Sequence, residues 1–167
     1  TGFHNFQLGI SEDSRNIYKS IHELTPYVKA CNIPLANFNK KIKINYKIFK
    51  FINAQKNIIV LPPQEQLNLF LNNPLFYESK KIYALIPWEL ESIPNYLDCI
   101  FDKIDTVLAP SKFIERAFSS VHNNVRLLPH YVDINLEINV KRFKKFTFIY
   151  SADLNSFVAR KNPMCVI

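Results

Sequence analysis

Short apolar runs alternate along the chain with segments whose apolar residues recur at helical spacing. The apolar runs predict six strands, at residues 33–38, 57–63, 80–87, 105–110, 124–130 and 146–151. The amphipathic segments predict helices at residues 11–32, 64–73, 95–104 and 112–121, with a further loop and helix start over residues 155–167.

Local signals refine three of these helices. In the first, Ser11 is a candidate N-cap, and one apolar stripe is expected from Ile17, Ile21, Leu24 and Val28. Pro94 suits the first position of the helix at 95–104, because its missing N–H costs nothing there. Ser111 suits the N-cap of the helix at 112–121.

Strands that alternate with amphipathic helices predict an α/β fold: a Rossmann-like, mostly parallel sheet with helices on both faces. In such sheets, ligands bind beyond the carboxyl ends of the strands. The distinctive residue clusters follow predicted strands at that edge; they are residues 9–15, 88–89, 109–111, 129–130 and 153–162.

Composition excludes several classes of protein. Hydrophobic residues make up 48% and aromatic residues 14%, too many for a disordered chain, while 2 Gly and 3 Cys exclude collagen and a disulfide scaffold. No apolar run approaches the roughly 20 residues of a membrane span, and residues 1–10 do not have the pattern of a signal peptide. The dispersed Cys and His residues indicate no metal site.

The net charge of +7 is compatible with nucleic acid, anionic membranes or phosphorylated substrates as partners. It can equally reflect compositional drift toward Lys, without a functional meaning. The basic and aromatic residues gather in the segment Lys40–Phe51. This segment is a solvated strand face, a peripheral contact with anionic lipid, or a seat for a phosphorylated acceptor. Nucleic acid is not expected, since no recognised nucleic-acid-binding motif accompanies the charge.

Five segments carry a family resemblance. Gly9, Glu12 and Arg15 have the spacing G-x-x-E-x-x-R, and residues 153–163 read D-x-x-S-x-x-x-R-K-N-P. Between them lie IPWELESIPNYL, DTVLAPSKFIERAF and LLPHYVDI. In this order the segments resemble the two-domain GT-B glycosyltransferases, in particular the family 4 enzymes of bacterial surface-polysaccharide synthesis. One departure is that His130 and Tyr131 replace the family's Asn-Gly.

The resemblance implies a domain plan. Residues 1–135 would form the N-terminal, acceptor-side domain, residues 136–145 a linker, and residues 146–167 the truncated start of the C-terminal donor-binding domain. The family's first strand would be ending at Thr1 and Gly2, and the chain would stop inside the first helix of the second domain.

The same resemblance implies a function. The full-length parent would transfer a hexose from a nucleotide sugar to a glycan or lipid-linked acceptor, with retention of configuration, no cofactor and no obligatory metal. The fragment alone would be inactive, and its location cytoplasmic, with peripheral contact at the inner face of the plasma membrane. The alternatives are an inactive remnant or binding module of the same fold, and a basic nucleic-acid-binding domain.

Site residues follow from these motifs, and the catalytic residues are not identified. The expected acceptor cleft residues are Gly9, Glu12, Arg15, Glu89, Ser111 and His130. The expected ligands of the donor diphosphate are Asp153, Ser156, Arg160, Lys161 and Asn162.

Structural explanations compete with functional ones at Arg15 and at the neighbours Trp88 and Glu89. Arg15, a cation in the first turns of a helix, either faces phosphate or another domain, which the resemblance favours, or pairs with Glu12 or Asp13. Trp88 either stacks on a sugar or fills the core, and the core is favoured, whereas Glu89 is favoured for the cleft.

Overall fold

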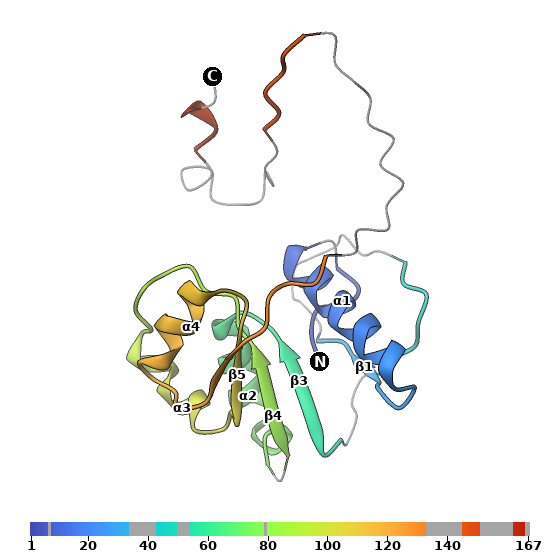
Figure 1. The fold of residues 1–167 in the computed structure, drawn as a ribbon. Helices are drawn as coiled ribbons and strands as arrows, with labels where there is room; N and C mark the ends of the chain where they lie inside the picture. The colour runs from blue at the N-terminus through green and yellow to red at the C-terminus, as the bar shows by residue number, and fades with distance from the viewer. Residues whose placement is uncertain are drawn as a thin grey trace. The chain divides into compact units, whose positions relative to one another are not determined.

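A computed structural model describes residues 1–6, 8–33, 43–49, 54–78, 80–132, 145–150 and 162–165. The chain divides into two compact units, Thr1–Asp133 and Ile134–Ile167. The first unit is an α/β fold with a parallel sheet, which confirms the predicted fold class (Figure 1).

The first unit contains four α-helices among its described residues: α1 (Gly9–Leu24), α2 (Pro63–Asn72), α3 (Asp98–Phe101) and α4 (Lys112–Ser119). Its strands are β1 (Ala30–Cys31), β2 (Ile48–Phe49), β3 (Lys56–Val60), β4 (Lys81–Leu85), β5 (Thr106–Ala109) and β6 (Val125–Leu127). Two 3₁₀ helices, η1 (Pro74–Phe76) and η2 (Asn95–Leu97), complete the unit.

Gly2 joins two groups of parallel strands. One group has the order β3-β4-β5-β6, and the other is the pair β1-β2. Gly2 forms parallel bridges to Asn32, just after β1, and to Val60 at the end of β3. The strand order is therefore β2-β1-Gly2-β3-β4-β5-β6. It runs outward in both directions from the first segment of the chain, which is the switch-point arrangement of doubly wound sheets.

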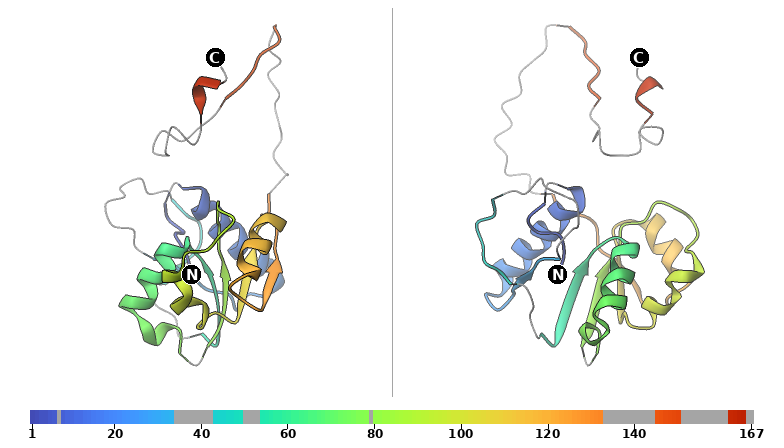
Figure 2. Two further views of the ribbon diagram at one scale, coloured as in Figure 1. Left: turned by 90° about the vertical axis from the view of Figure 1, so that its left-hand side faces the viewer. Right: turned by 180° about the vertical axis from the view of Figure 1, so that it is seen from behind.

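Successive residues of the strands face two different layers. Ile59, Ile82 and Val107 belong to one core cluster together with residues of α2, α3 and α4. Their neighbours Ile58 and Tyr83 instead line a cavity with residues of α1. Because side chains alternate along a strand, α1 covers the opposite face from α2–α4. Figures 1 and 2 show α1 beside β1 and β3, apart from the other three helices.

The prediction of a helix over 11–32 is wrong at both ends. The chain enters α1 at Gly9 and leaves it at Leu24, with extended backbone at Thr25 (φ −156°, ψ 130°). Pro26 explains the early end, because a residue before proline avoids the helical region. The freed residues Ala30 and Cys31 form β1. The predicted strand at 33–38 falls outside the described residues after Ile33.

The predicted apolar stripe of α1 does not pack as expected. Ser11 is not the N-cap but a buried residue inside the helix, and Ser14 is buried beside it. Leu24 is 85% exposed, while Ile17 and Ile21 line the cavity beside the sheet. The first turns of α1 thus pack on the sheet through the small polar side chains of Ser11 and Ser14. The apolar residues Ile17 and Ile21 line a cavity.

Later elements follow the predictions more closely. The predicted strands at 57–63, 80–87, 105–110 and 124–130 correspond to β3, β4, β5 and β6, and the helices at 64–73 and 112–121 to α2 and α4. Ser111 is confirmed as the N-cap of α4, since its Oγ accepts the N–H of Ile114 at 3.3 Å. The helix predicted at 95–104 is shorter than expected: Pro94 precedes η2, and α3 ends at Phe101.

In the second unit, described residues 145–150 form no strand, so the strand predicted at 146–151 is wrong over that range. Phe146, Phe148 and Ile149 are strongly exposed there. A strand needs a hydrogen-bonding neighbour, and among the described residues none pairs with residues 145–150 as a strand. The helix start expected over 155–167 is described only as the 3₁₀ turn η3 (Pro163–Cys165). Within the described ranges of both units, no helix has the length and apolar character that crossing a bilayer requires.

The two glycines provide a matched stability test. A Cβ at Gly2 would lie 2.3 Å from Ser14 Oγ and 3.0 Å from the carbonyl oxygen of Val60, whereas a Cβ at Gly9 would meet nothing within 4 Å. Gly2→Ala should therefore lower the free energy of unfolding by about 1–3 kcal/mol through overpacking. Gly9→Ala should leave it unchanged or raise it by about 0.5–1 kcal/mol, because alanine favours a helix. Urea unfolding of both variants measures the difference, and equal stabilities would contradict the close approach of α1 to the sheet.

Candidate functional site

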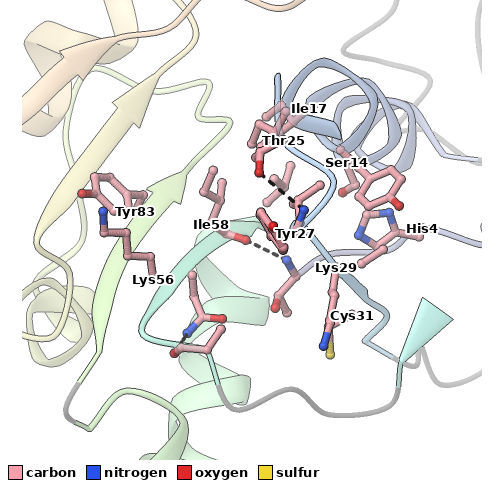
Figure 3. A pocket seen from close by; sticks show the side chains of 18 of the residues that line it. His4, Ser14, Ile17, Thr25, Tyr27, Lys29, Cys31, Lys56, Ile58 and Tyr83 are labelled. Carbon is pink, nitrogen blue, oxygen red and sulfur yellow. Dashed lines mark hydrogen bonds between the residues drawn. The ribbon is translucent and has the colours of Figure 1, made fainter. Parts of the chain in front are cut away.

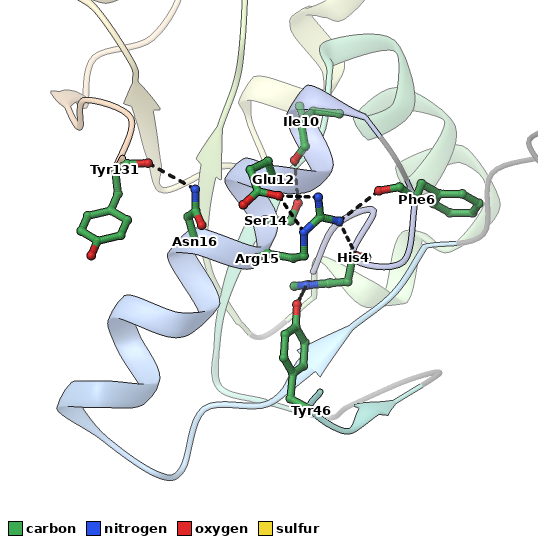
Figure 4. A network of polar contacts seen from close by, with 9 residues as sticks. All are labelled: His4, Phe6, Ile10, Glu12, Ser14, Arg15, Asn16, Tyr46 and Tyr131. Carbon is green, nitrogen blue, oxygen red and sulfur yellow. Dashed lines mark hydrogen bonds and ion pairs between the residues drawn. The ribbon is translucent and has the colours of Figure 1, made fainter. Parts of the chain in front are cut away.

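Arg15 fastens the loop after Gly2 to the start of α1 (Figure 4). Its Nη1 donates to the carbonyl oxygens of His4 at 2.8 Å and Phe6 at 3.0 Å. Its Nε and Nη2 donate to Glu12 Oε2 at 3.0 and 2.6 Å. These contacts use four of the five N–H donors of a guanidinium. The side chain is only 10% exposed, so the cation is held inside the loop.

Of the two alternatives for Arg15, the geometry shows the ion pair with Glu12 rather than Asp13, and it leaves a phosphate-facing or interdomain role untested. It also explains why a cation is tolerated in the early turns of a helix, where the macrodipole disfavours it. Two backbone carbonyls and a carboxylate surround the charge and offset the unfavourable dipole. Arg15 therefore fixes the path of residues 4–6, which lie between Gly2 and α1 in the chain.

His4 lies on the other side of this loop, against two tyrosines. Its Nδ1 is 3.0 Å from the Tyr46 hydroxyl, and the rings of Tyr46 and Tyr18 stack at 4.2 Å between centroids. Burial, with smaller contributions from the N-terminal amine and Arg15, lowers the pKa of His4 to about 3. Burial likewise raises the pKa of Tyr46 to about 12. Near neutral pH both groups are uncharged. The cluster of His4, Tyr18 and Tyr46 is therefore held by ring packing and one hydrogen bond between neutral groups.

A second group of contacts joins α1 to the segment that follows β6. His130 Nδ1 lies 2.8 Å from Asp13 Oδ1, and Asn16 Nδ2 donates to the carbonyl oxygen of Tyr131 at 3.3 Å. Figure 4 shows Asn16 reaching from α1 to Tyr131. Beneath these contacts is a cavity of about 430 Å³. The polar residues that line it are Asp13, Asn16, Ser20 and His130. The other lining residues are Ile17, Ile21, Ile58, Leu85, Leu128, Pro129 and Tyr131.

The structure brings together some of the expected cleft residues. Gly9, Glu12 and Arg15 all lie in the first two turns of α1, and His130 contacts that part of the helix through Asp13. Gly9 is the first residue of α1 and has no positive φ, so its conformation does not require glycine.

Glu89 and Ser111 are placed differently. Each follows a strand at its carboxyl end, β4 and β5 respectively, and both are exposed. Ser111 is occupied as the cap of α4. Trp88 packs against the core, with its ring 6.4 Å from that of Phe118, and donates from Nε1 to the carbonyl oxygen of Ser92 at 3.2 Å. This confirms the expected core role of Trp88.

Most of the expected donor-site residues lie outside the described part of the chain: Asp153, Ser156, Arg160 and Lys161. Asn162 is described. It has a positive φ of 47°, and its Nδ2 lies 2.9 Å from Cys165 Sγ. Within residues 162–165, then, Asn162 shapes the turn that starts η3.

Of the segment Lys40–Phe51, residues 43–49 are described. Lys43, Asn45 and Lys47 are exposed, while the intervening Ile44 and Tyr46 are half-buried, so exposure alternates although the chain bends at residues 45–46. Lys47 Nζ lies 4.9 Å from the centroid of the Phe49 ring. One of its aromatic residues, Tyr46, faces His4.

Sequence reasoning missed the partners of the expected residues. The sequence indicates Asp13 as a candidate ion-pair partner of Arg15, yet its carboxylate contacts His130, 117 residues away. The pairing of His4 with Tyr46 likewise spans 42 residues. No local spacing signals such contacts. Among the described residues, no three His, Cys, Asp or Glu side chains gather as a metal site requires.

The loop contacts make Arg15 a sensitive position. Arg15→Ala should lower the free energy of unfolding by about 2–4 kcal/mol, because charge-assisted hydrogen bonds are lost and buried carbonyls are left unpaired. Glu12→Gln is the matched control: its side chain is 55% exposed, so losing the ion pair should cost about 0–1 kcal/mol. Denaturant unfolding measures both, and an Arg15→Ala chain as stable as the Glu12→Gln chain would refute the fastening role.

Two buried bases should make the fold sensitive to acid. Burial lowers the pKa of the Thr1 amine from 8.0 to about 6, and that of His4 from 6.5 to about 3. The unfolded chain therefore binds more protons, so stability should rise with pH between about 6 and 8 for the amine and between about 3 and 6.5 for His4. Urea unfolding from pH 4 to pH 8 tests this.

In His4→Gln, which keeps a polar side chain but does not titrate, the slope below pH 6 should flatten while the slope between 6 and 8 remains. An unchanged slope below pH 6 would show that His4 does not carry the effect.

No protein-family model matches the chain, and neither a curated protein nor a solved structure is detectably similar to it.

Proposed function

We propose that the first unit is the acceptor-side domain of a GT-B glycosyltransferase, and that the cavity between α1 and the segment after β6 holds a sugar ring of the acceptor. The parent enzyme would transfer a hexose from a nucleotide sugar to a glycan or lipid-linked acceptor with retention of configuration. The observation that carries the proposal is the combination of this cavity with the strand order on either side of Gly2.

The strand order supports the proposal because it places a switch point beside Gly2. In open parallel sheets the crevice at such a point, beyond the carboxyl ends of the strands, is where ligands bind. The loop held by Arg15 and the first turns of α1 follow Gly2, which is bridged to Asn32 and Val60, at this edge. The segment that carries His130 follows β6 at the same edge of the parallel sheet.

The cavity lining suits a sugar. A carboxylate, an imidazole and an amide, from Asp13, His130 and Asn16, can accept or donate hydrogen bonds to hydroxyl groups. The aliphatic floor and the Tyr131 ring can contact the apolar face of a pyranose. The volume of about 430 Å³ is within the range of small-molecule sites.

Donor binding belongs to the other half of the proposal. Arg160 and Lys161 would hold the diphosphate of the nucleotide sugar, where cations neutralise the charge of the leaving group. Their support is the similarity of the segment ARKNP to the family motif. The proposed acceptor site does not depend on them.

Saturation-transfer NMR on the chain with a panel of monosaccharides and short glycans tests the acceptor site. We expect binding with a dissociation constant of about 1 mM for at least one hexose, as is usual for a single sugar with few polar contacts. Asp13→Asn should weaken that binding about tenfold or more, since it removes a carboxylate acceptor. The matched control is Asp102→Asn, an exposed carboxylate next to α3 and away from the cavity.

Two outcomes would contradict the proposal. One is the absence of saturation transfer to every sugar in the panel. The other is equal binding by the Asp13→Asn and Asp102→Asn chains. A salt-dependent retention of DNA or RNA without sugar binding would instead favour the nucleic-acid alternative.

A further inference from the structure

The polar side chains that line the proposed sugar cavity bond to one another, and those bonds determine what is left for a ligand. His130 Nδ1 lies 2.8 Å from Asp13 Oδ1. An ionised carboxylate only accepts hydrogen bonds, so Nδ1 carries the proton of the neutral imidazole and Nε2 keeps a lone pair. Within the described part of the chain, Nε2 of His130 and Oδ2 of Asp13 have no partner.

Two further groups of the lining use their donors in the same way. Asn16 Nδ2 donates to the carbonyl oxygen of Tyr131 at 3.3 Å, which orients the amide and leaves Oδ1 as an acceptor. Ser20 Oγ donates its single hydrogen to the carbonyl oxygen of Asn16 at 3.0 Å, so only its lone pairs remain. The donors that remain are the second N–H of Asn16 and the Tyr131 hydroxyl.

The side chains of the cavity therefore offer a ligand more acceptors than donors. The acceptors are His130 Nε2, Asp13 Oδ2, Asn16 Oδ1 and Ser20 Oγ. One of them belongs to a carboxylate, which gives the cavity a negative charge at neutral pH when the imidazole is uncharged.

No lysine or arginine offsets this carboxylate in the lining, all of which lies within the described residues. Arg15 is on the same helix, but it donates to Glu12 and to two loop carbonyls and is only 10% exposed. The larger cavity beside α1, of about 830 Å³, is different, because Lys29 and Lys56 are among the residues that line it (Figure 3).

We propose that the smaller cavity selects an uncharged sugar ring whose hydroxyl groups donate hydrogen bonds, and that it excludes phosphorylated sugars and phosphate headgroups. This inference rests on the proposed function and names the acceptor class: the neutral terminal residue of a glycan, with any lipid phosphate outside the cavity.

The chemistry of the two ligand classes explains the selection. A phosphate oxygen is a negatively charged acceptor, so beside Asp13 it would meet another acceptor of the same charge. A hydroxyl hydrogen can instead be donated to any of the free acceptors. The net charge of +7 alone would favour an anion, so the selectivity comes from the groups in the cavity.

Two-dimensional NMR titrations of the chain test the inference, with D-glucose, D-mannose and D-galactose each compared with its phosphate ester at the primary hydroxyl. Amide shifts at Asp13, Asn16 and His130 report the smaller cavity, and shifts at Lys29 and Lys56 report the larger one. In the smaller cavity, the best-binding hexose should bind about tenfold or more tightly than its phosphate ester, because the ester places like charges together.

A variant tests whether the lack of a cation causes this preference. Ser20→Lys places an ammonium group at the cavity, so it should improve binding of the phosphate ester by about tenfold through a charge-assisted hydrogen bond. Ser119→Lys is the matched control: it makes the same change at the exposed end of α4, away from the cavity, and should leave the preference unchanged.

Fluorinated sugars test the direction of the hydrogen bonds without changing the protein. Fluorine replaces a hydroxyl but cannot donate a hydrogen bond. At each position where replacing the hydroxyl of the best-binding hexose by hydrogen weakens binding, replacing it by fluorine should weaken binding equally.

Several results would overturn this inference and leave the sugar site standing. They are equal or tighter binding of the phosphate esters, deoxyfluoro sugars that all bind as well as the parent hexose, and a Ser20→Lys chain that keeps the original preference. If no sugar shifts the residues of the smaller cavity, the proposed function itself is wrong, and this inference with it.

Discussion

The close approach of α1 to Gly2 determines how the helix and the two groups of strands pack in the first unit. Gly2 forms parallel bridges to Asn32, just after β1, and to Val60 of β3, so it connects the two groups of strands into one parallel arrangement. Ser14 of α1 lies so near to Gly2 that no side chain fits between them. The early turns of the helix are therefore packed through Ser11 and Ser14, while Ile17 and Ile21 remain over the two cavities.

Arg15 connects the start of α1 to the loop beside the candidate site. Its contacts with the carbonyls of His4 and Phe6 set the loop, and the same helix presents Asp13 and Asn16 on a different side. The helix α1 thus holds the loop of residues 4–6 through Arg15. It also positions Asp13 and Asn16 to contact the segment after β6. The proposed sugar site is built from residues that come together only because α1 crosses the sheet where Gly2 allows it.

The fold was predictable to the extent that its signals are local. Short apolar runs or helix caps in the sequence mark five elements: β3, α2, β4, β5 and α4. Ser111 caps α4, as the sequence indicates. The end of α1 was missed because its apolar spacing continues past Pro26, although proline outweighs that pattern. The two-residue strands β1 and β2 are too short for periodicity to reveal. The contacts of His4 and His130 join residues 42 and 117 positions apart, which only the folded chain brings together.

The proposed sugar site lies at the edge beyond the carboxyl ends of the strands, between α1 and the segment after β6. Mapping amide chemical shifts of the chain by two-dimensional NMR during a titration with the best-binding hexose tests it most directly. If a hexose binds there, the largest shifts fall on residues that line one cavity: Asp13, Asn16, Ser20, His130 and Tyr131. Shifts confined instead to the basic residues 43–49, or spread evenly over the exposed surface, would contradict it.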